Sequence, residues 1–187
     1  MSGPNSIEHV ELEAGEWLLR PPRPEDATDA LTLVSDPDVV QWNPIGPAKP
    51  LPDAPAVERW LARAADWSAG DHVSFAVVES ATGRLAGSVS LHRIDREQSG
   101  ASIGYRVAPW ARGRGAATAA VAFVTDWAFA GLGLARVELC HAVVNPASCR
   151  VALKAGYPIE GTLRAAFVYG DGKRYDEHIH GRLASDG

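Results

Sequence analysis

The chain has 187 residues, of which 46% are hydrophobic and 22% charged, a composition that suits one folded domain and excludes intrinsic disorder. Its formal net charge of −5 argues against nucleic acid or an anionic membrane surface as the main partner. The first residues are acidic and lack the apolar segment of a secretory signal, and no apolar run reaches membrane-spanning length, so we expect a cytoplasmic protein.

The N-terminal third predicts a tail over residues 1–14, a short strand in "EWLLR", and a helix that begins near Pro24 and closes at Pro37. The proline-rich stretch "NPIGPAKPLPDAP" (43–55) is interpreted as an active-site loop or lid. A second helix is predicted over 56–69, because apolar residues recur there at helical spacing.

Three alternating stretches then predict an antiparallel meander of strands at 73–79, 85–94 and 101–107. The rest of the chain predicts an alanine-rich helix, a buried strand, a short helix and a closing hairpin, at 113–132, 136–144, 145–156 and 157–183. This order, β-α-α-βββ-α-β-α-ββ, predicts one α+β domain over 15–184 with a mixed, mostly antiparallel sheet.

The turn "VAPWARGRGAATAA" (107–120) places two arginines beside glycines where a strand passes into a helix. Small residues let a phosphate approach the free N–H groups that open a helix, where the helix dipole also favours negative charge. Guanidinium groups suit a pyrophosphate. No lysine stands where a P-loop requires one, and Thr118 occupies the third glycine position of a Rossmann fingerprint. The alternative is a turn that contains glycines for conformational reasons, with arginines exposed to solvent and no bound anion.

Arg112-x-x-Gly115-x-Ala117 after a strand ending in V-x-P resembles the coenzyme A signature of the GNAT superfamily of N-acetyltransferases. The segment 145–157 is similar to the family's N-x-x-S-x-x-x-x-x-K-x-G-F/Y segment. "EGTLR" and "GDGKRYDEHIHGRL" resemble the closing hairpin of the branch that acetylates N-terminal amines of ribosomal proteins. The resemblance spans residues 15–183 and implies about seven strands, splayed between the fourth and fifth, with helices on both faces.

Acetyl-CoA is the co-substrate that this resemblance implies, held by a core at 100–157 between acceptor-side helices at 24–70 and the hairpin at 157–183. The pantetheine arm would pair with the end of the fourth strand, and the pyrophosphate would lie on the opening turn of the next helix. The cofactor-binding residues carried over are Arg106, Val107, Arg112, Gly113, Arg114, Gly115, Ala116, Ala117, Thr118 and Asn145. Asn145 has a second interpretation as a helix cap.

The resemblance also implies direct attack of a neutral amine on the thioester, without a metal or a covalent intermediate. Many relatives carry a tyrosine as the acid where this chain has Ala152, and the ribosomal branch assigns that role to a serine at the Ser148 position. Ser148 can alternatively cap free N–H groups. Glu138 is the candidate base, on the strand face opposite His141, although a structural carboxylate beside Arg136 or Arg106 is an equal alternative.

The sequence is compatible with two kinds of acceptor, a protein N-terminal amine or a small-molecule amine such as an amino sugar or polyamine. A third alternative is a sensor that binds acyl-CoA and has no acceptor. Trp42, Trp60 and Trp67 belong to the acceptor-side helices and fit either core packing or an aromatic pocket wall. His178 and His180 would share a strand face, but two ligands without a third predict no metal site. Family relatives are frequently dimers, so a homodimer is a further expectation.

Overall fold

One eight-stranded sheet forms the centre of the computed structural model, which describes residues 6–43 and 52–186. Its order is β1-β2-β3-β4-β5-β6-β8-β7, and only the β5–β6 pair is parallel. The strands are β1 (Leu12–Ala14), β2 (Trp17–Arg20), β3 (Val73–Glu79), β4 (Leu85–Asp95), β5 (Gly100–Val107), β6 (Arg136–Ala142), β7 (Ile159–Val168) and β8 (Arg174–Leu183). The predicted mixed α+β sheet is therefore confirmed.

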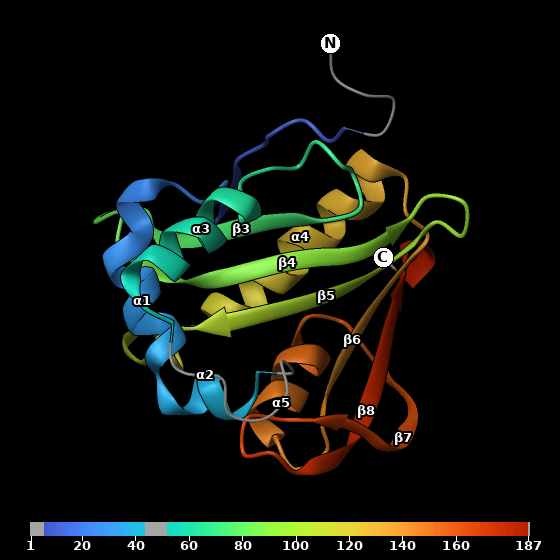
Figure 1. The fold of residues 1–187 in the computed structure, drawn as a ribbon. Helices are drawn as coiled ribbons and strands as arrows, with labels where there is room; N and C mark the ends of the chain where they lie inside the picture. Colours follow the sequence, from blue (N-terminus) through green and yellow to red (C-terminus); the bar gives the residue numbers. More distant parts are fainter. Residues whose placement is uncertain (1–5, 44–51, 187) are drawn as a thin grey trace.

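Helices cover both faces of this sheet (Figure 1). They are α1 (Ala27–Ser35), α2 (Pro37–Gln41), α3 (Ala54–Ala64), α4 (Ala116–Leu132) and α5 (Pro146–Lys154), with short 3-10 turns at Pro24–Asp26, Pro109–Ala111 and Ala184–Asp186. The larger core joins α4 and α5 to residues such as Phe75 and Leu139, whereas a second core joins α1 and α3 to Ala76 and Val78. No helix within the described residues is long and apolar enough to cross a membrane.

Three N-terminal predictions differ from the structure. The helix predicted over 56–69 spans Ala54–Ala64, so Trp67 lies beyond its end. The sheet has eight strands rather than about seven, because Leu12–Ala14, within the predicted tail, pairs with β2. Pro37 ends one helix as predicted, but it also opens α2 at the first helical position. The Asp36 side chain caps α2 by accepting hydrogen bonds from the N–H groups of Asp38 and Val39, each at 3.1 Å.

The sheet is splayed between β5 and β6, as the family resemblance predicts. The two strands pair only where Gly100, Ala101 and Ser102 face Arg136, Val137 and Glu138. Beyond these residues β6 continues its pairing with β8 instead, and Figure 1 shows β6, β8 and β7 running away from β5. The described strands thus leave a wedge that opens toward the end of β5.

Candidate functional site

A narrow cleft, too tight in this structure to hold a water molecule, lies where the open end of β5 meets the first turn of α4. It is lined by small and apolar residues from β3, β4, β5 and α4, namely Val77, Ala86, Gly87, Ser88, Tyr105, Arg106, Val107, Ala116, Ala117 and Ala120. Four of these residues, Arg106, Val107, Ala116 and Ala117, are ones for which the sequence predicts cofactor contacts. The structure therefore brings the two predicted halves of the cofactor site together.

The start of α4 presents backbone N–H groups without a side-chain cap. Gly113 and Gly115 adopt left-handed φ angles of +76° and +87°, which explains the glycines, and a Cβ on either would meet nothing within 4 Å. The first intrahelical bond is from the Ala119 N–H to the Gly115 carbonyl at 2.9 Å. The amides of residues 116–118 thus have no intrahelical partner among the described residues, and such opening groups of a helix bind anions well.

Arg112 and Arg114 border this turn with their charges already paired. Arg112 forms ion pairs with Asp36 and, at 2.9 Å, with Asp38. The Arg114 guanidinium contacts Glu16 at 2.6 Å and Glu79 at 2.7 Å, and those hydrogen bonds raise its pKa. It also lies over the rings of Trp17 and Trp110. The arginines anchor the turn to α2, β2 and β3, so a pyrophosphate would have to share them with these carboxylates.

Ser148 has a hydrogen-bond partner that the sequence does not predict. The Tyr105 hydroxyl, on β5, donates a hydrogen bond to Ser148 Oγ at 2.9 Å, across the wedge from α5. Ser148 is only 9% exposed, and its own N–H donates to Asn145 Oδ1 at 3.1 Å, so Asn145 caps α5 as the alternative interpretation predicts. Burial raises the pKa of Tyr105 above its ordinary value, although the Ser148 hydrogen bond opposes the shift.

Glu138 lies at the closed end of the wedge, opposite Ser102 in register. Its carboxylate accepts hydrogen bonds from Arg136 Nε and NH2 at 3.1 and 3.0 Å. Arg136 also holds Glu160, whose pKa this hydrogen bonding lowers. By strand alternation Glu138 points away from the face that α5 covers, so the structure does not bring it to Ser148.

A different carboxylate lies buried beside the closing hairpin. Glu177, on β8, is 8% exposed and faces Ala142 across the β6–β8 pairing. Its Oε1 accepts a hydrogen bond from the Tyr169 hydroxyl at 2.5 Å. Burial, and then the nearby Glu177 carboxylate, raise the pKa of Tyr169. The alternation of "RYDEHIH" could have indicated an inward-facing Glu177, but only once its face was known.

Residues 40–43 connect this hairpin to the end of β5. Trp42 packs against Tyr169 and Tyr175, with ring centroids 6.0 and 6.2 Å apart. Arg106 NH2 donates to Asn43 Oδ1 at 3.2 Å. The Gly170 N–H donates to the Gln41 carbonyl at 3.0 Å, and a Cβ on Gly170 would lie 2.0 Å from the Val40 oxygen, so this approach requires glycine. The interpretation of 43–55 as a lid falls mostly on residues 44–51, outside the described residues.

The other tryptophans of the acceptor-side region belong to the core. Trp67 is 1% exposed and packs against Phe75 and Trp127. Trp60 packs against the smaller core of α1 and α3. Of the three tryptophans considered, Trp42 is therefore the one that lies against the hairpin.

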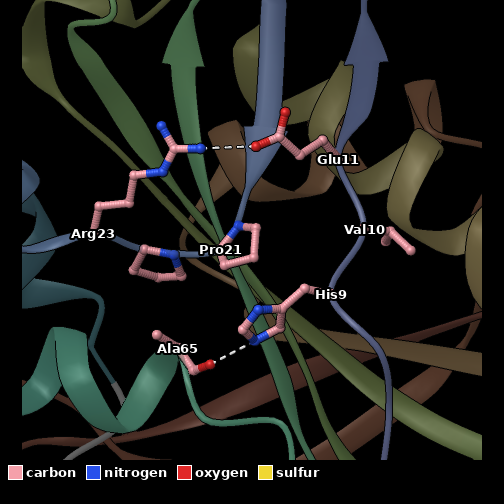
Figure 2. Close-up of a pocket in the computed structure, with 7 residues that line it drawn as sticks. His9, Val10, Glu11, Pro21, Arg23 and Ala65 are labelled. Carbon is pink, nitrogen blue, oxygen red and sulfur yellow. Dashed lines mark hydrogen bonds and ion pairs between the residues drawn. The ribbon is translucent and has the colours of Figure 1, made fainter.

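A separate cavity of about 350 Å³ lies between the N-terminal segment and the turn after β2 (Figure 2). The polar groups in its lining already bind one another: Arg23 contacts Glu11 at 2.9 Å, and the His9 ring contacts the Ala65 carbonyl at 2.8 Å. Because it shares no residue with the cleft beside α4, this cavity adds nothing to the chemistry described above.

Comparison with known proteins identifies the family of this fold and cleft. Residues 17–158 match the family model described as an acetyltransferase (GNAT) domain. The uncharacterized N-acetyltransferase YoaA of Bacillus subtilis (strain 168) is 25% identical over 169 residues, 90% of this chain and 94% of the relative. The putative ribosomal N-acetyltransferase YdaF of the same organism is 38% identical over 94 residues, 50% of this chain and 51% of the relative.

Solved structures give the same fold. The ribosomal-protein-S5-alanine acetyltransferase from Vibrio fischeri superposes with a TM-score of 0.82 at 20% sequence identity. The superposition covers 95% of this chain and 98% of that one. At this level of identity the likeness concerns the arrangement of the elements, and the acceptor of the Vibrio enzyme is a property of that enzyme.

Proposed function

The chain belongs to the GNAT family of acetyltransferases, and we propose that it transfers an acetyl group from acetyl-CoA to a primary amine by direct attack on the thioester. The uncapped first turn of α4, adjoining the cleft at the open end of β5, is the observation that carries this proposal. The amides of residues 116–118 would bind the pyrophosphate, and the pantetheine would follow Arg106 and Val107 into the wedge.

The Tyr105–Ser148 hydrogen bond supports the assignment of Ser148 as the acid that protonates the leaving thiolate. The amine nitrogen attacks the thioester carbon, the oxyanion intermediate collapses, and the carbon–sulfur bond breaks. Ser148 then gives its proton to the departing thiolate and recovers one from Tyr105, which takes a proton back from solvent as CoA leaves. The raised pKa of Tyr105 keeps its hydroxyl protonated between turnovers at neutral pH. Asn145 helps by fixing the first turn of α5.

The buried Glu177 supports an amine-binding role on the acceptor side. A carboxylate beside the rings of Trp42, Tyr169 and Tyr175 suits a primary ammonium group, which gains both a counter-ion and aromatic faces. Glu177 would bind the amine and accept its proton directly or through water. Glu138 remains the alternative base, with its bond to Arg136 as the argument against it.

We take a protein N-terminal amine as the first acceptor, since the relative YdaF is described as a putative ribosomal N-acetyltransferase. A small-molecule amine is the second candidate, because Glu177 and its aromatic neighbours would accept any accessible primary ammonium group. Net acidity of the chain favours a cationic acceptor in both cases.

Thiol release from acetyl-CoA, measured across a panel of amines, tests the proposal. The panel contains peptides with a free N-terminal alanine or serine, the same peptides with a blocked N-terminus, a polyamine and an amino sugar. We expect thiol release with the free peptides and none with their blocked forms. Release only with the small amines would select the second acceptor class. Tight binding of CoA with no release on any amine would identify a sensor and refute the enzymatic proposal.

A further inference from the structure

Four side chains form a cluster between α5 and the face of β6 and β8 that α5 covers. The proposed acetyl transfer does not use them. They are His141 on β6, Cys149 on α5, and His178 and His180 on β8, and their ligand-type atoms all lie within 4.8 Å of one another. We propose that this cluster, which we call the His₃Cys cluster, is a binding site for a zinc ion. The inference is independent of the proposed acetyl transfer.

The hydrogen bonds of two histidines fix the tautomers that a metal site needs. His141 Nδ1 lies 2.8 Å from the Ala142 carbonyl oxygen, and His180 Nδ1 lies 2.9 Å from that of Tyr157. A carbonyl oxygen can only accept, so both Nδ1 atoms donate. Neutral rings of this tautomer carry their lone pairs on Nε2. Backbone carbonyls hold metal-ligating histidines in the same way.

Those two Nε2 atoms face each other at 3.0 Å. Two lone pairs at this distance repel, and the repulsion is relieved only if a cation lies between them or one ring gains a second proton. His180 is 0% exposed and His141 is 4% exposed, so a protonated ring would be a buried charge. A metal ion satisfies both lone pairs at once.

His178 supplies an independent indication. Its Nδ1 is buried and has no hydrogen-bond partner among the described residues. Buried ring nitrogens are nearly always satisfied, because leaving one unpaired costs the full desolvation penalty. His178 belongs to the same group of four residues, and the Cys149 sulfur completes it.

The types of donor atom in the cluster, histidine nitrogen and cysteine sulfur, favour zinc. Imidazole nitrogen and thiolate sulfur both bind zinc, and three of the first with one of the second would fill the four positions of a tetrahedral ion. Such a site would be structural, because no position is left for a substrate. The ion would join α5 to β6 and β8, on the side of the wedge away from β5. Cys149 is the neighbour of Ser148, so zinc would hold the turn of α5 that positions Ser148 against Tyr105.

Zinc titration of protein stripped with a chelator, followed with a chromophoric competitor, measures the site without reference to catalysis. We expect one zinc per chain and a higher melting temperature with the metal bound. Cys149→Ser and His178→Ala should each weaken zinc binding at least about 100-fold, since even outer contacts of zinc ligands are worth 10–100-fold. Cys140→Ser is the matched control, because Cys140 is exposed and points to the opposite face.

Cobalt substitution covers the case in which a variant fails to fold. Wild-type protein loaded with Co²⁺ should show the thiolate-to-metal charge-transfer band and the intense visible bands of a tetrahedral site. Absence of zinc binding, or zinc binding by Cys149→Ser equal to that of the wild type, would overturn the proposal. A cobalt spectrum without the thiolate band would do the same, and a proton shared by His141 and His180 would then explain their contact.

Discussion

The Tyr105 hydroxyl and Ser148 Oγ form a hydrogen bond of 2.9 Å that links β5 to α5 across the open wedge of the sheet. If Ser148 protonates the leaving thiolate, Ser148→Ala should lower kcat about 100-fold or more while leaving the KM for acetyl-CoA nearly unchanged. Tyr105→Phe should lower kcat less, because Ser148 keeps its own proton. Steady-state kinetics with varied acetyl-CoA measure both quantities.

The exposed Ser80 provides the control, as Ser80→Ala should retain wild-type kinetics. Because burial raises the pKa of Tyr105, the hydroxyl stays protonated through neutral and mildly alkaline pH, and the acid step should not be lost as pH rises from 7 to 9. Unimpaired turnover of Ser148→Ala would leave this residue only the alternative role of capping free N–H groups of α5.

Arg112 and Arg114 give a prediction that depends on their ion pairs. Arg112→Ala should raise the KM for acetyl-CoA about 10-fold if the guanidinium reaches the pyrophosphate, as hydrogen bonds to charged groups are worth about 1.5–3 kcal/mol. Asp38→Asn leaves Arg112 in place but removes one competing carboxylate, so it should lower that KM. Equal cofactor affinity in all three proteins would make the Asp36–Arg112–Asp38 contacts purely structural.

Glu177→Gln should affect binding of the amine acceptor without affecting binding of acetyl-CoA. We expect the KM for the amine to rise about 10-fold or more, or kcat to fall, with the KM for acetyl-CoA unchanged, because the amide keeps the shape but loses the charge. Glu138→Gln is the matched comparison, because Glu138 on β6 lies on the same face of the sheet as Glu177 on β8. A larger loss of kcat in Glu138→Gln than in Glu177→Gln would restore Glu138 as the base.

The sequence was informative where function depends on a contiguous stretch. The turn from Arg112 to Thr118 predicts a candidate anion site, because backbone amides, small residues and a helix start are all local properties. Family membership and the splayed sheet were likewise predicted and are confirmed. The N-terminal strand β1 escaped prediction because three residues carry too little alternation to distinguish a strand from a tail.

Contacts between distant residues could not be predicted in the same way. Tyr105 and Ser148 are 43 positions apart and meet only once the fold brings α5 to the end of β5. The sequence does not predict Glu177 as a site residue, because its burial depends on Tyr169 and on the hairpin lying against α2. The pair in "HIH" suggested no metal, since its third and fourth partners come from β6 and α5.

The buried ion pair of Arg20 and Asp26 provides a prediction about stability. Two parallel bonds of 2.7 and 2.9 Å join side chains that are 7% and 3% exposed. Asp26→Ala would leave the buried Arg20 guanidinium without its counter-ion. The free energy of unfolding should fall by about 3–5 kcal/mol, and the melting temperature by roughly 6–20 °C. The exposed pair of Arg23 and Glu11 is the control, since Glu11→Ala should cost less than about 1 kcal/mol. Similar losses in both variants would contradict the role of burial.

Calorimetric titration of acetyl-CoA into the wild type and into Ala117→Glu tests the cofactor site most directly. Ala117 is the second residue of α4 and lines the cleft, so a carboxylate there would repel a pyrophosphate while suiting the helix dipole. We predict micromolar-range or tighter binding by the wild type, a loss of at least about 10-fold in the variant, and equal melting temperatures. Equal affinity in the two proteins, or no binding by the wild type, would contradict the placement of acetyl-CoA on α4.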